Sequence, residues 1–287
     1  MRGLRSQVAG RRPQGPGSRP RPFHDDDGRA TLAHANGSGR TGNGNGARAN
    51  GNGRPAQLPS IGGEVVDPRT VAVEVEGLGA REVIAWAIER FHPALRFAVS
   101  FQRTSSVIID LAHGIEPGAS FFYLDTDLLF PETYATRDLL VERYGINLRR
   151  YAGISLEEQA EHEGASLWRR HPDACCGIRK VEPMRAALSE AECWVSGIRR
   201  ADSPTRAGAA KLGWDKRFGL WKLNPLADWT DEQVAKHIRE NQVPYNPLHD
   251  QGYPSIGCIH CTVRPTAPGD RSGRWSGRDK TECGINE

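Results

Sequence analysis

Short apolar segments alternate with helical segments along most of this chain, and this alternation limits its fold more than any other feature. Strand-like runs are predicted at residues 95–101, 119–124, 147–151, 192–196 and 217–223. Helices are predicted between and around them, at residues 78–91, 107–112, 131–144, from 155 onward and from 230 to about 241. Apolar strands separated by helices are typical of parallel sheets with both faces covered. We therefore expect an α/β fold with a mostly parallel sheet flanked by helices.

The ends of the predicted helices carry local signals. Pro93 stops the first helix, and Pro131 stands at the favoured first turn of another. Ser155–Glu158 has the pattern of a capping box, and Thr230–Gln233 caps the last predicted helix. After Val243 proline, glycine and asparagine dominate, so we expect loops from there to the end.

Residues 1–60 differ in composition from the rest of the chain. They contain ten Arg, no Lys, three Asp and no Glu, a net charge of +7, together with twelve Gly and almost no large apolar residue. Such a segment buries too little apolar surface to offset the entropy lost on ordering it. We predict a disordered segment at 1–60, an α/β domain at 61–270 and a mobile C-terminal tail at 271–287.

Charge and cysteine content exclude several classes of protein. The whole chain carries +3, so removal of the +7 at 1–60 leaves −4 for the remainder, which gives no electrostatic case for nucleic-acid binding. We recognise no signal peptide and no apolar run long enough to cross a membrane, and therefore expect a cytoplasmic protein. In that compartment the six cysteines indicate metal or catalytic roles rather than disulfides.

Four of the cysteines form two tight pairs, Cys175 with Cys176 and Cys258 with Cys261. Four thiolates bind either tetrahedral zinc or an iron–sulfur cluster. Adjacent cysteines must splay apart, which suits two irons of a [4Fe–4S] cluster better than one zinc ion, although zinc stays open. Cys193 lies alone in an apolar strand, and we expect an inert core thiol there.

The sixth cysteine, Cys283, lies five residues from the C-terminus, and no apolar run near it would bury it. An exposed cysteine on a mobile segment is best explained as a reactive thiol that is carried to its target. We therefore predict that Cys283 is a nucleophile.

Polar residues also follow two predicted strands. The loop from Ser100 to Ser106, including Ser105, is rich in hydroxyl groups and opens a helix, where backbone N–H groups favour an anion. Leu124 and Thr126 flank the end of the next strand, and open α/β sheets bind ligands at that edge. The loop lacks the glycines of a Walker or dinucleotide motif, and an ordinary helix N-cap explains it equally well.

Cationic residues lie beside these motifs. They are Arg179, Lys180, Arg199, Arg200, Arg271 and Arg274. Each alone is more often a solvated surface charge, but together they would bind a polyanionic substrate through charge-assisted hydrogen bonds. Lys180 would also lie close enough to the cysteines to couple a cluster to that substrate electrostatically.

Taken together, these motifs resemble those of the assimilatory adenylyl-sulfate (APS) reductases, close relatives of the phosphoadenylyl-sulfate (PAPS) reductases. The resemblance covers Phe97 to the C-terminus and rests on 175–180, 195–200, 222–226, 243–258, 273–275 and 282–284. It implies an adenine-nucleotide α-hydrolase-like (PP-loop) fold, in which Ser100–Ser106 is a modified pyrophosphate loop. It also implies reduction of APS to sulfite and AMP with thioredoxin, in sulfate assimilation and cysteine biosynthesis.

The resemblance assigns roles to individual residues. Cys175, Cys176, Cys258 and Cys261 match the ligands of one [4Fe–4S] cluster, and Cys283 matches the nucleophile that becomes an S-sulfocysteine. Lys180, Arg271 and Arg274 match sulfate and phosphate contacts. PAPS remains the alternative substrate, and a PP-loop RNA-thiolating protein or a non-catalytic iron–sulfur regulator is a more distant alternative. Oligomeric state, including a homo-oligomer, is left open.

The C-terminal sequence departs from the family pattern. The family tail usually reads Cys-Gly-Leu-His, whereas this chain has Ile285 and Asn286 after Cys283 and Gly284. Asn forms hydrogen bonds but does not become cationic, and Glu282 should raise the pKa of the thiol. We hypothesise that Lys180 and the arginines stabilise the thiolate here more than in related proteins.

Overall fold

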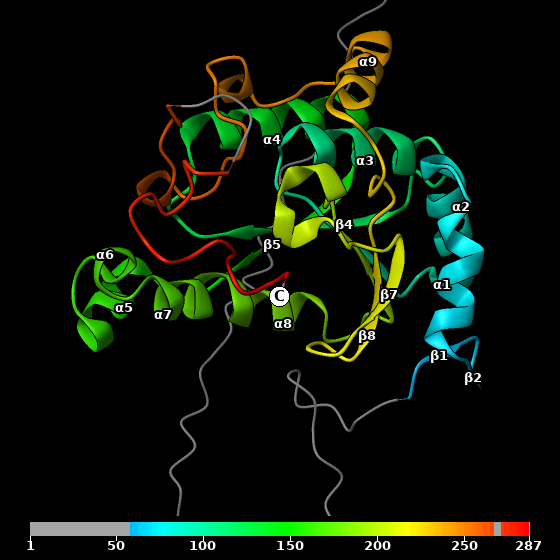
Figure 1. Ribbon diagram of the computed structural model, residues 1–287. Helices are drawn as coiled ribbons and strands as arrows, with labels where there is room; N and C mark the ends of the chain where they lie inside the picture. Colours follow the sequence, from blue (N-terminus) through cyan, green and yellow to red (C-terminus); the bar gives the residue numbers. More distant parts are fainter. Residues whose placement is uncertain (1–57, 267–270, 287) are drawn as a thin grey trace, which may run out of the picture.

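A six-stranded sheet forms the centre of the computed structural model, which describes residues 58–266 and 271–286 (Figure 1). The strand order is β5-β4-β3-β6-β8-β7, and only the edge strand β7 is antiparallel to its neighbour. The strands are β3 (Leu95–Ala98), β4 (Ser120–Asp125), β5 (Asn147–Ala152), β6 (Cys193–Val195), β7 (Leu212–Asp215) and β8 (Leu220–Leu223). The expected mostly parallel α/β sheet is confirmed.

Helices lie on both sides of this sheet. They are α1 (Pro68–Glu76), α2 (Ala80–Phe91), α3 (Arg103–His113), α4 (Pro131–Tyr144), α5 (Leu156–Glu163), α6 (Leu167–Arg170), α7 (Pro172–Cys176), α8 (Glu182–Ala187) and α9 (Asp231–Asn241). A π-helical turn (Gly177–Val181) joins α7 to α8. Figure 1 shows α3, α4 and α9 on one side of the sheet and α8 on the other. None of the described helices is long and apolar enough to span a bilayer.

Two separate cores follow from the period-two alternation of strand side chains. Phe121 and Tyr123 of β4 pack into the larger core with α2 and α3, whereas Phe122 packs on the opposite face against Met184 of α8 and Trp194 of β6. Successive side chains of a strand point to opposite faces, so a fully apolar strand serves both layers at once. This arrangement explains why the buried strands read as continuous apolar runs.

The predicted boundaries hold in most places and fail in two. Thr230 caps α9 through a complete capping box, and Pro131 opens α4 as expected. The strand expected at 217–223 begins only at Leu220, because residues 216–219 form the turn of a hairpin whose first strand, β7, we did not predict. An edge strand of mixed polarity lacks the apolar run on which the prediction depended.

The N-terminal boundary also moves. Ser60, which we placed in the disordered segment, belongs to a short strand β1 (Ser60–Ile61) paired with β2 (Glu64–Val65). The carbonyl of Ser60 accepts a hydrogen bond from Trp221 Nε1 at 2.8 Å, which ties it to the sheet. Residues 1–57 lie outside the described residues, so their predicted disorder stays a prediction.

Past Val243 the described chain forms loops and two single turns of 3₁₀ helix (Pro247–His249 and Ile259–Cys261), as expected. The last residues return to the body of the protein, and Figure 1 shows the C-terminal end beside α8. There Ile285 packs against the core that includes Met184. The segment expected to be a mobile tail is thus seated against the domain.

Candidate active site

A cavity of about 520 Å³ opens at the carboxyl ends of β3, β4 and β6. Ser100, Leu124 and Thr126 line it, as the strand-end argument predicted, together with Ser196 and Gly197 after β6. This edge is where open α/β sheets bind ligands, because loops and helix N-termini converge there. The cavity is therefore the candidate substrate site.

The loop between β3 and α3 has an unusual backbone. Phe101 adopts φ of 57°, in the left-handed region that non-glycine residues rarely occupy, and its side chain is buried. The surrounding structure must hold this conformation in place, and such residues concentrate at functional sites. Ser105 does not line the cavity, since its Oγ donates to the carbonyl of Gln102 and its side chain is buried.

A second, smaller cavity is lined by all four paired cysteines, Cys175, Cys176, Cys258 and Cys261. The first two come from α7, Cys258 caps the 3₁₀ turn Ile259–Cys261, and Cys261 is the last residue of that turn. The tertiary fold therefore brings the two sequence pairs together, across a separation of more than 80 residues. Thr126 of the first cavity contacts Cys258, with Oγ1 and Sγ 3.3 Å apart.

The π-helical turn connects the two cavities. Arg179 points inward and is 1% exposed, and its guanidinium donates to the carbonyl of Thr126 and pairs with Asp127. The next residue, Lys180, lines both cavities. Insertion of a π turn into a helix shifts the side chains that follow it, and such turns are frequent at functional sites.

Lys180 lies among sulfur atoms. Burial acts to lower its pKa, but negative charge on the nearby sulfur atoms of Cys258, Cys283 and Cys176 outweighs burial and raises the pKa above its ordinary value. The amine therefore stays protonated at neutral pH. A cation fixed between the cysteine pairs and Cys283 is the arrangement expected from the sequence.

The cysteine cavity also contains hydrogen-bond donors that lack partners. Arg179 Nε and Trp275 Nε1 are buried there without an acceptor among the described residues. Buried N–H groups normally find acceptors, because an unmade hydrogen bond costs about 1–3 kcal/mol. An anionic sulfur-containing group in this cavity would satisfy both donors. The four thiols and these donors are of the chemical types that suit an iron–sulfur cluster.

Burial favours the protonated form of two of these thiols, Cys175 and Cys176, in the absence of a bound group. It raises the pKa of Cys175 to about 12, with the neighbouring thiol of Cys176 adding to the effect. It also raises the pKa of Cys176 to about 11, against the opposing charge of Lys180. Since a ligating sulfur is a thiolate, loading a metal group here displaces protons.

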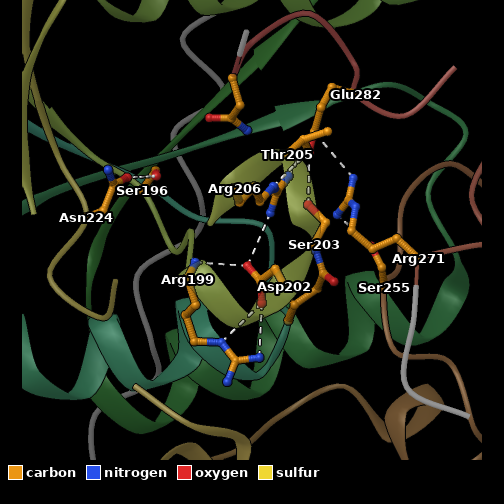
Figure 2. Close-up of polar contacts among 12 residues, drawn as sticks. Ser196, Arg199, Asp202, Ser203, Thr205, Arg206, Asn224, Ser255, Arg271 and Glu282 are labelled. Carbon is orange, nitrogen blue, oxygen red and sulfur yellow. Dashed lines mark hydrogen bonds and ion pairs between the residues drawn. The ribbon is translucent and has the colours of Figure 1, made fainter. Parts of the chain in front are cut away.

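A chain of alternating charges runs along one wall of the larger cavity (Figure 2). Arg199 pairs with Asp202, Asp202 pairs with Arg206, and Arg206 binds Glu282 through two contacts of 2.8 Å. Arg271 completes the chain at 3.3 Å from Glu282. Bidentate contacts between guanidinium and carboxylate are among the strongest hydrogen bonds in proteins. Glu282, 8% exposed, is therefore held beside Cys283 by two arginines.

The predicted arginines differ in how they are placed. Arg271 and Arg274 both line the larger cavity, and each donates to Ser255 Oγ. Arg274 fits because residue 257 is glycine, since a Cβ there would meet its guanidinium at 2.2 Å. Arg199 also lines the cavity, but it pairs with Asp202 and Asp231, so much of its charge is already neutralised.

Cys283 lines the larger cavity together with Ile285 and Asn286, and contacts with the domain hold the residues that follow the cysteine. The carbonyl of Gly284 accepts from Arg217, and Asn286 Oδ1 accepts from Lys222 Nζ at 3.0 Å. Gly284 has φ of +80°, a conformation that favours glycine. Lys280, the nearest basic residue to Glu282 in the sequence, pairs with Asp173, and Glu282 is bound by Arg206 and Arg271.

Sequence reasoning did not find Arg206 or Lys222. Arg206 ends a single 3₁₀ turn (Pro204–Arg206) between β6 and β7 and belongs to no motif. Lys222 opens the 222–226 motif on which the resemblance rests, but we assigned it no role. Its position as a lysine within an apolar strand was a further signal, because such a residue must find a partner.

The contact of Glu282 with Arg206 gives a pH-dependent stability. Although burial opposes the shift, Arg206 and Arg271 lower the pKa of Glu282 below its ordinary value of 4.5. A lowered pKa in the folded state contributes stability above pH 4.5 that is lost as the pH falls through the folded-state value. We expect Glu282→Gln to reduce the free energy of unfolding at pH 6 by about 2 kcal/mol. For a domain of this size, that loss lowers the Tm by roughly 4–8 °C.

That difference between wild type and Glu282→Gln should begin to shrink as the pH falls below about 4.5 and should vanish below the folded-state pKa of Glu282, where both side chains are neutral. Thermal unfolding of the two proteins between pH 3 and pH 7 checks it. Glu157→Gln, at an exposed position of α5, is the control. A difference that stays constant across this range would contradict the assigned role of the carboxylate.

Comparison with known proteins is consistent with this geometry. The family described as phosphoadenosine phosphosulfate reductase domain matches residues 94–264. The chain is 46% identical to an adenosine 5′-phosphosulfate reductase of Salinibacter ruber over 217 residues, which are 74% of this chain and 86% of that protein. It is 45% identical over 212 residues, 73% of this chain, to adenosine 5′-phosphosulfate reductase 1 of Bacillus subtilis, of which they cover 91%.

A solved structure is also similar. The crystal structure of a phosphoadenylyl-sulfate reductase from Candida auris, a phosphate complex, superposes with a TM-score of 0.62 at 32% identity. The match covers 72% of this chain and 100% of that one.

Proposed function

The chain belongs to the phosphoadenosine phosphosulfate reductase family, and from that premise we propose that it reduces adenosine 5′-phosphosulfate to sulfite and AMP. The observation that carries the proposal is the placement of Cys283. Its tail forms part of the wall of a strand-end cavity that also contains Lys180, Arg271 and Arg274. A nucleophile and three cations facing one space suit an anionic substrate.

The first step transfers the sulfuryl group to the protein. The thiolate of Cys283 attacks the sulfur of the sulfuryl group, an S–S bond forms, and the S–O bond to the bridging oxygen breaks. AMP leaves with the electron pair as a phosphate anion, and Cys283 becomes an S-sulfocysteine. Because an anion attacks an anionic centre, the cations Lys180, Arg271 and Arg274 must offset the repulsion.

The second step regenerates the thiol, with thioredoxin as the proposed reductant. A thioredoxin thiolate attacks Sγ of Cys283, and sulfite leaves with the electron pair of the S–S bond. The second thioredoxin thiol then resolves the mixed disulfide. Thioredoxin loses two electrons and sulfur goes from the sulfate to the sulfite oxidation state. We place this reaction in the cytoplasm, where thioredoxin is kept reduced.

The paired cysteines Cys175, Cys176, Cys258 and Cys261 are the proposed ligands of one [4Fe–4S] cluster. Such a group would supply acceptors for the unpartnered N–H groups of Arg179 and Trp275. Lys180 lines the cysteine cavity and the substrate cavity, so its charge acts on both. The family resemblance supports this cofactor, and the donor set of the cavity fits it.

Sulfite release tests the proposal. Anaerobically purified protein with reduced thioredoxin should release sulfite from APS at least tenfold more efficiently than from PAPS, measured as kcat/KM. PAPS carries an additional ribose 3′-phosphate, and loss of its pairing with a dedicated cation is worth at least 1.4 kcal/mol, or tenfold. Preference for PAPS would make the protein a PAPS reductase, and no sulfite from either nucleotide would overturn the proposed reaction.

A further inference from the structure

We propose that Lys222 is a positioning residue, which seats Asn286 and thereby keeps Cys283 at the wall of the substrate cavity. The inference rests on the proposed function for what the seated thiol does, but not for the contact itself. Lys222 does not line the cavity, whereas Cys283 and Asn286 both do. Lys222 therefore acts on the thiol through the tail rather than on a substrate.

The contact joins the last described residue of the chain to the central sheet. Lys222 belongs to β8, paired on both sides by β6 and β7, so its backbone position is rigid. Its Nζ donates to Asn286 Oδ1 at 3.0 Å and lies 4.6 Å from the centre of the Trp194 ring. The amide oxygen of Asn286 and the aromatic face of Trp194 thus both contact the ammonium group of Lys222. Because Lys222 belongs to the sheet, the sheet fixes the position of the end of the tail.

This anchor completes a set of contacts around Cys283. Arg206 holds Glu282 on one side of the thiol, and Arg217 binds the carbonyl of Gly284 on the other. Beyond Gly284, the other contact found among the described residues is the packing of Ile285 against the smaller core. The lysine therefore determines whether the segment after the nucleophile stays docked.

The surroundings of Lys222 explain why a neutral acceptor suits it. Burial lowers the pKa of Lys222 to about 8, with Arg206 adding to the effect and Asp215, Glu282 and Cys283 opposing it. A second cation beside this amine would weaken its binding further. Asn286 offers a carbonyl oxygen and carries no charge at any pH. Asn286, which stands where the family usually has His, is therefore a suitable partner for Lys222.

Release of the tail by trypsin tests the contact independently of catalysis. Cleavage after Lys280, whose side chain is 7% exposed, requires the tail to leave its seat. In the full-length anaerobic protein at pH 8, Lys222→Met should release the peptide that begins at Thr281 about tenfold faster than wild type, as expected for loss of one buried hydrogen bond to a charged group. Asn286→Leu should give the same increase, and the double variant no further increase.

The functional arm uses a single turnover with APS and no thioredoxin. Lys222→Met should slow formation of the S-sulfocysteine about tenfold without changing the Kd for AMP, and Lys222→Arg should recover most of the rate. Lys216→Met, at an exposed position of the same hairpin, is the matched control and should behave as wild type.

The positioning role would be overturned if Lys222→Met and Asn286→Leu were cleaved by trypsin at the wild-type rate. It would also be overturned if the two effects multiplied in the double variant. Failure of the wild-type protein to react with APS would instead overturn the proposed function. The trypsin result would still stand in that case, so the two failures are distinguishable.

Discussion

Replacement of Cys283 by serine should abolish sulfite release from APS, with a fall of at least about 10⁴-fold in kcat. A serine hydroxyl is almost wholly protonated at neutral pH, and no described group in the cavity is placed as its base, whereas the thiol supplies a thiolate and a sulfur that thioredoxin can attack. The rest of the site should be unaffected, because Cys283 is not among the residues of the cysteine cavity. If the proposed cluster is present, the variant should therefore keep the visible absorbance of the wild type, and it should still bind AMP.

Cys193→Ala provides the matched control for this experiment. Cys193 is 0% exposed within β6, and burial raises its pKa well above the ordinary value, so it is an inert thiol. Its loss should leave the rate of sulfite release within about twofold of wild type. Retained activity in Cys283→Ser would refute the S-sulfocysteine mechanism and point to a different nucleophile.

Replacement of Lys180 by glutamine should lower the rate of S-sulfocysteine formation by roughly 10²–10³-fold, the range found when a charge-stabilising group is removed from an active site. Lys180 lies between the cysteine cavity and the substrate cavity, so no nearby cation occupies the same position. Both the approach of the Cys283 thiolate and the charge of the substrate depend on it. Lys180→Arg keeps the charge and should recover part of the rate.

A single-turnover experiment with APS measures this effect directly, and iron content with visible absorbance shows whether the cysteine site is still loaded. Lys236→Gln, on the exposed face of α9, is the control. A variant that keeps its iron and reacts at the wild-type rate would show that Lys180 does not stabilise the reacting charges. Loss of both iron and activity would place its main role in the cysteine cavity; the rate of iron-loaded Lys180→Arg then decides whether its charge also serves the reaction.

The placement of the tail changes how the departure at Asn286 is understood. From the sequence we expected Glu282 to raise the pKa of the Cys283 thiol. We expected Lys180 and the arginines to stabilise the thiolate against this effect. In the structure Arg206 and Arg271 bind Glu282 directly, and Lys222 binds Asn286. The carboxylate thus serves as an attachment point for the tail, and its charge is offset where it lies.

The prediction of a mobile C-terminal tail is also changed by these contacts, because they define a docked position for the tail. Contacts to Glu282, Gly284 and Asn286 describe a docked position with Cys283 at the cavity wall. In the second step of the proposed reaction thioredoxin attacks the same sulfur, and we expect these contacts to open for that attack. Strong contacts favour the docked tail, which attacks the substrate. Weak contacts favour the released tail, in which the intermediate is reduced.

Local sequence determined much of this protein. Continuous apolar strands, helix caps and prolines are short-range signals, and they predicted β3 to β6 and the helices α2, α4 and α9 closely. The cysteine pairs and the strand-end residues Ser100, Leu124 and Thr126 were also readable, because strand polarity places all carboxyl ends at one edge. Candidate roles for the cysteines could therefore be predicted from the sequence alone, because thiols have a distinctive chemistry.

Only the tertiary structure decided which charges face one another. Arg206 and Glu282 are 76 positions apart and Lys222 and Asn286 are 64 apart, so no local pattern links either pair. Arginine and lysine are common on any surface, and burial beside a partner is what distinguishes these two. That burial depends on how a loop, a hairpin and the C-terminal tail pack together. The nucleophile was therefore evident in the sequence, whereas the contacts that seat it became evident only in the fold.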